Sequence, residues 1–422
     1  MKEARDSRAR ATGAAAWLPC ALGASFFGYA YFLRVAPSAM IEDLMRAFDV
    51  SALALGNLGA AYFYVYACLQ LPLGLAIDRL DARRILVCGI AVAAGGTLFF
   101  ALAEGLPAAY ASRLLIGAGC ATAWIGTLKL AMLYLPVGRY ALVAGLTNLV
   151  GMAGAMSAQA PLALVVQAIG WRNAMLAAAA MGALLALMLM ATRMPTRTGP
   201  TPRPFAVSPW RDLLRLLARR QIWLIVLFTV CTASPIISFC VLWAVPYGMA
   251  AYGLDRPTAG TLASIGLLGW GIGGPILAPI SERLGRRKPI LLLGPLGVAA
   301  SMGLLLWPGL PLAGAYAALL LGGCCTGAVI CVFAVAKEVC PPSQGATVTS
   351  LLTAGMMVLT AALQVVMGYM LDRFWEGAMA NGARLYPAEA YRAGLMLMPC
   401  LSVIGLVVLR FVPETYCRQR GE

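Results

Sequence analysis

The sequence has no histidine, and only 12% of its 422 residues are charged. Seventeen residues are acidic, and each falls in an expected tail, in a loop or at the end of a long apolar segment. Paired acids and imidazoles are the side chains on which most acid–base catalysis depends. Because the apolar segments lack both, the sequence argues against an enzyme.

Cysteine patterns that bind metals are also missing. Most of the twelve cysteines lie inside apolar segments, and none forms a Cys-x-x-Cys pair. Cysteines in this setting usually serve as small packing residues, whereas disulfides and zinc sites need paired spacings. The one adjacent pair, Cys324-Cys325, leaves transport of Cu(I) by soft sulfur ligands as a minor alternative. We expect no metal site and no cofactor.

Long apolar segments dominate instead. Hydrophobic residues make up 61% of the chain, and the segments recur about every 35 residues, whereas about 20 apolar residues suffice to span a bilayer. The sequence therefore predicts an all-α membrane protein with twelve transmembrane helices. The expected spans are 14–40, 52–76, 85–103, 108–134, 140–168, 173–192, 221–247, 258–280, 289–308, 312–336, 345–371 and 390–411.

The net charge of +15 comes from basic residues that are concentrated in the tails and in alternate loops, so it does not indicate nucleic-acid binding. Of the 32 basic residues, 23 lie in the tails and in the loops after even-numbered spans, and six lie in the opposite loops. Basic residues concentrate on the cytoplasmic side of membrane proteins. We therefore expect both termini in the cytoplasm of a bacterial-type inner membrane, with the first apolar segment retained as a span and not cleaved as a signal peptide.

Three basic residues, Arg34, Arg113 and Lys129, fall within spans. A charge at the centre of the hydrocarbon costs about 2.5–3.5 kcal/mol on insertion scales, so such residues usually have a function or reach the membrane surface. Lys129 is about 160° around the helix and ~24 Å along it from Arg113, so both cannot contact one small ligand. Its position near Pro136 favours a surface-reaching role.

The two halves of the chain repeat at an offset of 204 or 205 residues. Asp78-Arg79 corresponds to Glu282-Arg283, and Gly117 in span 4 corresponds to Gly322 in span 10. This repeat predicts a bundle of six helices (1–192), a linker (193–220) and a second bundle of six (221–422), with the ligand between them near mid-membrane. The second part of the linker, 210–220, alternates apolar and basic residues and is typical of a helix on the membrane surface.

The loop after span 2 resembles the signature of the major facilitator superfamily. It has Gly74, then Asp78-Arg79 and a basic pair, and the glycine pattern of span 4 also fits. In this family a carboxylate beside arginines at helix ends can form pairs that hold one conformation and break in another. The resemblance implies alternating access and, by the family's habit, a monomer. The candidate gating residues are Asp78, Arg79, Arg83, Arg84, Glu282, Arg283 and Arg286.

Within that superfamily, the segment from Tyr31 to Arg34 resembles the first helix of the organophosphate antiporters and of the anion/cation symporters. In those branches the arginine meets a phosphate or carboxylate. The phosphate exchangers have a second cation in span 7, and this chain has none there. This favours a carboxylate over a phosphate as the anionic group of the substrate. The symporters' acids are replaced by Leu33 and Cys120, so proton symport of the usual carboxylate type is not expected.

Helical spacing places further polar and aromatic residues on faces that can meet Arg34. Glu42, eight residues further along, is a competing internal partner for its charge. For the polar residues of spans 5 and 11, helix–helix packing is an equal alternative to ligand contact, and aromatic stripes are more often core. The candidate substrate-binding residues are Phe27, Tyr31, Arg34, Ser38, Tyr62, Tyr66, Arg113, Asn148, Gln159, Phe239, Trp243 and Gln364.

These features predict a secondary or facilitative transporter, embedded in the lipid bilayer, for a small organic anion or a carboxylate-bearing zwitterion. Arg34 would bind the carboxylate, and an apolar or aromatic body would lie against the second half. Efflux of drug-like or metabolite molecules is an alternative within transport. A sensor that binds its ligand without moving it is the alternative from another class.

Overall fold

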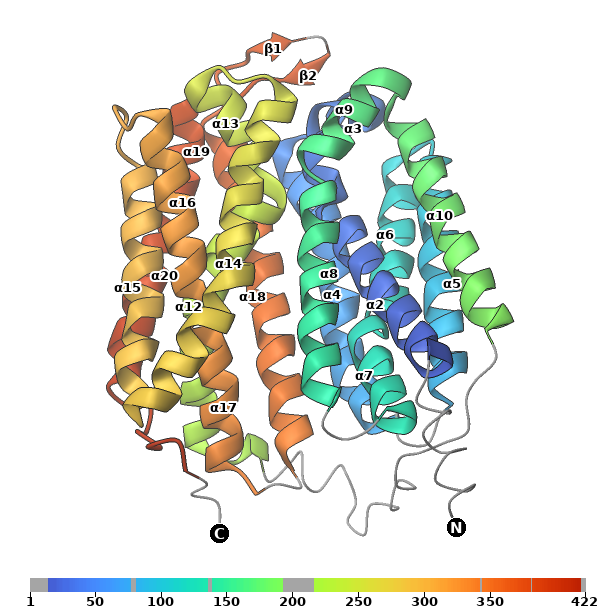
Figure 1. Ribbon diagram of the computed structural model, residues 1–422. Coiled ribbons are helices and arrows are strands. Elements are labelled where there is room, and N and C mark those ends of the chain that lie inside the picture. The colour runs from blue at the N-terminus through green and yellow to red at the C-terminus, as the bar shows by residue number, and fades with distance from the viewer. Residues whose placement is uncertain are drawn as a thin grey trace.

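The computed structural model describes residues 14–76, 81–135, 139–192, 216–341, 344–380 and 382–418. Nearly all of these residues are helical, and the long helices run side by side (Figure 1). The strands among them, β1 (Met379–Ala380) and β2 (Ala383–Arg384), form one short antiparallel hairpin with Met379 opposite Arg384. The expected all-α fold is confirmed.

Eleven helices among the described residues are long and apolar enough to cross a membrane, and a pair bent by 42° completes twelve. The helices of the first half are α2 (Ala14–Val35), α3 (Ile41–Phe48), α4 (Ala52–Ala76), α5 (Ala82–Ala101), α6 (Leu106–Cys120), α7 (Ala123–Tyr134), α8 (Tyr140–Ser157), α9 (Ala160–Ile169) and α10 (Trp171–Ala191), with a 3₁₀ turn, η1 (Ala36–Met40), between α2 and α3.

The second half contains a π-helical turn, η3, in the corresponding place. Its elements are α12 (Arg220–Ser238), η3 (Phe239–Trp243), α13 (Ala244–Tyr252), α14 (Arg256–Leu284), α15 (Lys288–Leu305), α16 (Leu312–Thr326), α17 (Val329–Val339), α18 (Gly345–Arg373), α19 (Ala388–Leu395) and α20 (Leu397–Leu409).

Large apolar side chains cover the outside of the bundle. Leu187 on α10 is 58% exposed, Leu321 on α16 is 63% exposed and Val407 on α20 is 55% exposed. Buried polar residues, among them Thr97, Gln159 and Thr360, lie inside. An apolar exterior around a partly polar interior is the arrangement that a lipid environment stabilises. The protein is therefore an integral membrane protein.

The internal repeat is visible in the helix boundaries. The pairs α4 and α14, α5 and α15, α6 and α16, and α8 and α18 begin 204 to 206 residues apart. Helices from the first half, blue to green, lie on one side of the molecule, and those from the second half, yellow to red, lie on the other (Figure 1). The two halves thus repeat one arrangement of helices, as the sequence predicts.

Span 1 is not one helix from 14 to 40. The α-helix ends at Val35 and a 3₁₀ turn follows, because Pro37 has no backbone N–H to donate to the carbonyl of Leu33. Span 7 is interrupted at the corresponding level by the π turn η3, which follows Pro235 in the last turn of α12. Span 5 bends at Gln159, between α8 and α9.

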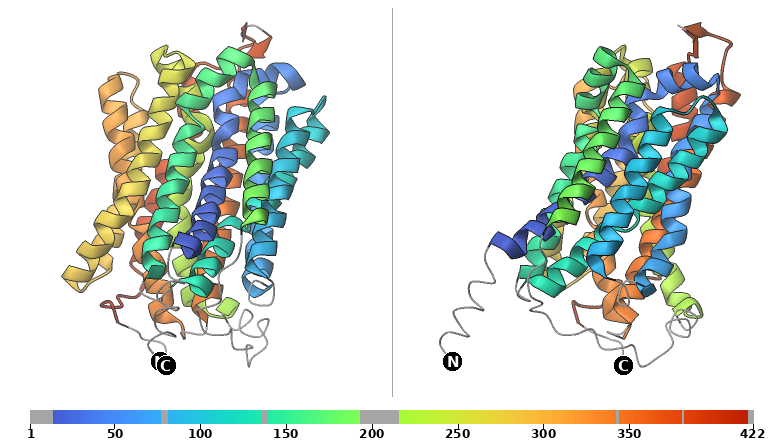
Figure 2. Two further views of the ribbon diagram at one scale, coloured as in Figure 1. Left: turned by 45° about the vertical axis from the view of Figure 1, so that its right-hand side comes forward. Right: turned by 90° about the vertical axis from the view of Figure 1, so that its right-hand side faces the viewer.

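We call the end of the bundle where α2 begins and α20 ends the terminal face, and the opposite end, where α3, α9, α13 and the hairpin lie, the far face (Figures 1 and 2). At the far face the halves are joined by charge. Arg256 of α14 donates to Asp43 at 2.5 Å and to Glu42 at 2.9 Å on α3. The carboxylate of Asp372 on α18 accepts the backbone N–H of Leu53 at 2.9 Å.

Most of the linker and part of the signature loop lie outside the described residues. This applies to most of the expected surface helix at 210–220 and to the candidate gating residues Asp78 and Arg79. The division of the chain at 193–220 therefore stays a prediction.

Candidate functional site

Arg34, in the last turn of α2, is surrounded by aromatic rings. Only 4% of its surface is exposed. Its guanidinium carbon lies 4.3 Å from the ring centre of Tyr31, 5.1 Å from that of Tyr66, 5.4 Å from that of Tyr62 and 5.7 Å from that of Phe63. Each such contact stabilises a cation by about 0.5–2 kcal/mol. The rings therefore offset part of the cost of burying this charge.

No acid of the described chain neutralises Arg34. None of the ion pairs among described side chains includes it, and its Nε has no hydrogen-bond partner. Glu42, the competing partner that the sequence suggests, binds Arg256 instead. The ring faces attract the cation, but an unpaired buried N–H donor is still costly, by about 1–3 kcal/mol.

Arg113 on α6 also lies close to the ring of Tyr62. It is 1% exposed, and its Cζ lies 5.3 Å from the ring centre of Tyr62. Its Nη1 donates to the carbonyl of Leu33 at 2.8 Å, whereas its Nε and Nη2 have no partner. Gly117 permits this approach, because a methyl group there would lie 2.4 Å from the Tyr62 carbonyl oxygen. The Tyr62 ring of α4 is therefore within cation–π distance of both Arg34 of α2 and Arg113 of α6.

Two predicted polar residues, Ser38 and Gln159, contact each other and not the arginines. The hydroxyl of Ser38 donates to Gln159 Oε1 at 3.0 Å, and Gln159 Nε2 donates to the carbonyl of Cys240 in η3 at 3.0 Å. Gln159 is fully buried. Both ends of its amide are thus used in joining η1, the α8–α9 bend and η3.

The remaining candidates in the first half are Phe27 on α2 and Asn148 on α8. Phe27, one turn before Tyr31, packs on it with ring centres 4.7 Å apart and also contacts Trp124. Asn148 is half-buried on α8, and no hydrogen bond joins its side chain to Arg34 or Arg113.

The second half contributes uncharged groups. Trp243 in η3 donates its Nε1 hydrogen to the backbone carbonyl of Gln364 at 3.3 Å. The side-chain oxygen of Gln364 has no hydrogen-bond partner. It lies close to Gly59 of α4, one turn before Tyr62, because a methyl group on Gly59 would be only 2.8 Å from it. Phe239 packs edge-on against Tyr247, within the second half.

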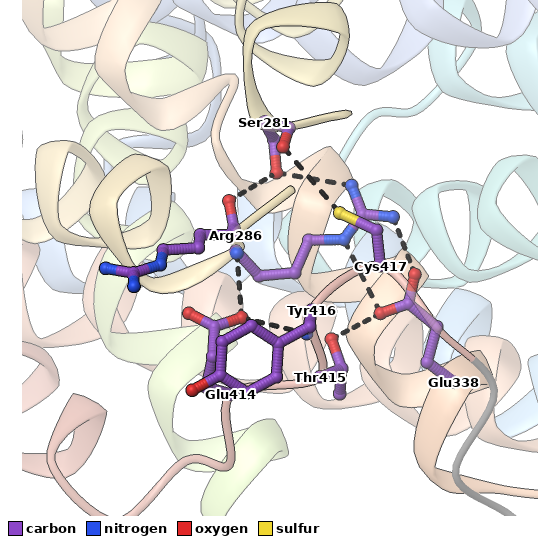
Figure 3. A network of polar contacts seen from close by, with 8 residues as sticks. Ser281, Arg286, Glu338, Glu414, Thr415, Tyr416 and Cys417 are labelled. Carbon is purple, nitrogen blue, oxygen red and sulfur yellow. Dashed lines mark hydrogen bonds and ion pairs between the residues drawn. The ribbon is translucent and has the colours of Figure 1, made fainter. Parts of the chain in front are cut away.

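A second polar cluster lies at the terminal face of the second half (Figure 3). Arg287 donates to Glu338 at 2.6 Å, and Thr415 donates to the same carboxylate. Glu414 accepts the backbone N–H groups of Arg287 at 2.8 Å and Lys288 at 2.9 Å. Partial burial of Glu414 opposes ionisation, but these backbone donors outweigh it and lower its pKa below the ordinary value.

Only some of the candidate gating residues make polar contacts of this kind. Arg83 donates to the carbonyl of Met190, and Arg84 and Arg286 take part through their backbone groups. Glu282 and Arg283 occupy the last turn of α14. Sequence reasoning missed Arg287 and Glu338 as a pair. The signal was a basic residue at the start of span 9 and an acid at the end of span 10, the next span along the chain.

Comparisons with known proteins agree with this architecture. The sequence profile of the Major Facilitator Superfamily matches residues 20–352 and 233–418. The chain belongs to the major facilitator superfamily. A stretch of 171 residues is 26% identical to the uncharacterized transporter YybO of Bacillus subtilis (strain 168), and it covers 40% of this chain and 39% of that protein.

Solved structures of two transporters share the fold. A bacterial homologue of the human lysosomal transporter Spinster, in an inward-facing and occupied conformation, superposes with a TM-score of 0.75 at 18% identity, over 93% of this chain and 96% of that one. A mutant of the nucleoside transporter NupG gives 0.73 at 12% identity, over 93% and 99%. The chain is therefore a member of this superfamily by its sequence profile, and it shares the fold of these solved transporters.

Among the described residues, no group of three or more Cys, Asp or Glu side chains is arranged to hold a metal ion. Arg34 and Arg113, both buried and both with unpaired donors, lie together with their aromatic neighbours Tyr31, Tyr62 and Tyr66. We call these five residues the arginine cluster.

Proposed function

We propose that this transporter moves a small organic anion across the membrane by alternating access, with a carboxylate of the substrate bound by Arg34. The observation that supports it most is the burial of Arg34 among four aromatic rings with no acid of the described chain beside it. A buried charge is retained at a cost unless it is paired in at least one state of the protein. The substrate provides that partner.

The position of the arginine cluster suits such a role. Arg34 precedes η1, and η1 contacts η3 of the other half through Ser38, Gln159 and Cys240. An anion on Arg34 therefore lies beside the segment where the two halves meet. With the termini in the cytoplasm, the far face is the outer side, and its cross-half contacts close that side in this conformation. The family's gating residues would act at the terminal face.

The test is uptake by proteoliposomes of a panel of radiolabelled monocarboxylates, dicarboxylates and amino acids. We expect Arg34→Gln to reduce uptake of the transported acid by at least about tenfold, because a charge-assisted hydrogen bond contributes about 1.5–3 kcal/mol. Thermal unfolding in detergent checks that the variant is folded.

Arg172→Gln is the matched control. Arg172 also lies 4.3 Å from an aromatic ring centre, that of Trp171, and donates to the carbonyl of Ala103 at 2.8 Å, but it belongs to α10 and lies outside the arginine cluster. We expect its uptake to stay near that of the wild type. Normal uptake by folded Arg34→Gln contradicts the proposal, and binding without uptake by the wild type identifies a sensor.

A further inference from the structure

Arg113 has a structural bond that leaves most of its guanidinium free. The carbonyl of Leu33 lies four residues before Pro37, which cannot donate to it, and Arg113 Nη1 takes that place at 2.8 Å. This bond ties Arg113 to the residue next to Arg34. It uses one of the five N–H donors of the guanidinium, and Nε and Nη2 remain buried without partners.

The two arginines share one neighbour and are close in space. Their guanidinium carbons lie 5.4 Å and 5.3 Å from the ring centre of Tyr62, so they are at most 10.7 Å apart. Three buried guanidinium nitrogens of these two residues have no hydrogen-bond partner: Arg34 Nε, Arg113 Nε and Arg113 Nη2. One short ligand can reach both cations.

The charge of the cluster is not balanced. No described acid pairs with Arg34 or Arg113, and the neighbouring positions Leu33 and Cys120 are neutral and buried. The arginine cluster therefore holds two positive charges in a site with almost no solvent. A ligand with one negative charge neutralises only one of them, and an uncompensated buried charge costs several kcal/mol.

From this balance we infer that the substrate is a small organic dianion, a short dicarboxylate whose first carboxylate binds Arg34 and whose second binds Nε and Nη2 of Arg113. The inference rests on the proposed function and narrows it. A neutral hydroxyl or amide in place of the second carboxylate accepts hydrogen bonds from Arg113 but leaves its positive charge without a counter-ion. The separation of the two guanidinium groups limits the chain between the carboxylates to a few carbons.

The test compares ligands that differ by one charge at equal length. Isothermal titration of the protein in nanodiscs at about pH 7.5, where carboxylic acids are ionised, uses succinate against butyrate, glutarate against pentanoate, and glycerol phosphate as a phosphate monoester. We expect at least one dicarboxylate to bind the wild type about tenfold or more tightly than its monocarboxylate partner. Arg113→Gln should bring the ratio of the two affinities close to one, mainly by weakening the binding of the dicarboxylate.

Arg113→Lys is the second variant, because lysine can keep both the charge and a bond to the Leu33 carbonyl. We expect it to retain part of the preference, and its folding checks that the loss in Arg113→Gln is not a loss of structure. The preference for a dicarboxylate over its monocarboxylate partner is measured on the wild type, so this part of the test does not depend on the folding of any variant. If no dicarboxylate binds more tightly than its partner, the inference is wrong.

The outcomes separate this inference from the proposed function. Equal binding of succinate and butyrate, with both lost in Arg34→Gln, overturns the dianion and leaves the anion site in place. Binding of every acid unchanged in Arg34→Gln overturns the proposed function itself. Tighter binding of glycerol phosphate than of any dicarboxylate overturns the assignment to dicarboxylates.

Discussion

Arg34 and Arg113 illustrate two ways in which a chain holds a buried cation without an acid. Arg34 relies on ring faces, which attract the charge but leave Nε unpaired. Arg113 relies on a carbonyl that Pro37 leaves without a helical partner. Both devices fix the guanidinium in position and leave donors available, which is the condition for a preorganised anion site.

Gln159 is the residue whose loss we expect to affect the contact between the halves most directly. Gln159→Leu removes the acceptor of Ser38 and the donor to Cys240, so two buried groups lose their partners. Each unpaired group costs about 1–3 kcal/mol. We expect a clearly lower thermal unfolding temperature in detergent, measured by intrinsic fluorescence.

Asn173→Leu provides the comparison for that measurement. Asn173 is exposed, and its side chain bonds only to the carbonyl of Ile169 one turn earlier. Its replacement should leave the unfolding temperature nearly unchanged. Equal effects of the two substitutions contradict the joining role of Gln159.

The sequence predicts much of the arginine cluster. Spacing alone places Tyr31 on the face of Arg34 and groups Tyr62 with Tyr66, and the structure brings these three rings around the guanidinium. Phe63 and the Arg113 bond to Leu33 were not predictable, because both depend on how α2, α4 and α6 pack. Ligand contact by Ser38 and Gln159 stays untested, but packing, the alternative reading for Gln159, accounts for both ends of its amide.

At the scale of elements, the first helix of each half is interrupted at the same level. Pro37 ends α2 in a 3₁₀ turn, and a π turn follows Pro235 in α12. The sequence shows the prolines but predicts continuous spans there, because hydropathy reports length and not backbone geometry. These irregular turns free carbonyls such as those of Leu33 and Cys240, which side chains then bind.

Helix α15 begins with backbone N–H groups that have no helical partner. Glu414, from the segment after α20, accepts those of Arg287 and Lys288. Glu414→Gln should therefore weaken the attachment of this segment, by about 0.5–2 kcal/mol as for other lost helix caps. The measurement is the thermal unfolding temperature of variant and wild type as a function of pH.

The pH dependence has a definite sign. Burial opposes ionisation of Glu414, but the backbone donors hold its pKa below the ordinary value of 4.5. The carboxylate therefore contributes stability above that value, and the contribution is lost as pH falls through the lower pKa of the folded protein. The difference between wild type and Glu414→Gln should be full at neutral pH and vanish in acid. A difference that grows in acid contradicts this assignment.

At the scale of the whole molecule, the halves repeat one plan but differ in charge. The position of Arg34 in the first half corresponds to Ser238 or Phe239 in the second, which are neutral and buried. A sequence offset is enough to predict both the repeat and this asymmetry. It does not predict which face is closed, because that depends on pairs such as Arg256 with Asp43, which are 213 residues apart.

Arg256 tests whether the far face opens as a unit. It binds Glu42 and Asp43 across the two halves, and its side chain is 13% exposed. Arg256→Gln removes both ion pairs, and a loss of about 1.4 kcal/mol changes a conformational ratio tenfold. We expect faster hydrogen exchange at the backbone amides of 36–48 and 52–60, measured by mass spectrometry on the protein in nanodiscs.

Two further variants make that measurement specific. Arg256→Lys reaches one carboxylate at a time, so its exchange should be intermediate between the wild type and Arg256→Gln. Arg392→Gln breaks an ion pair with Glu389 inside the second half, three residues away in the sequence, and should leave exchange at 36–48 unchanged. If Arg256→Gln exchanges like the wild type, the contacts at Asp372 hold the far face closed without Arg256. If Arg392→Gln exchanges as fast as Arg256→Gln, the effect is one of general stability and not of separating the halves.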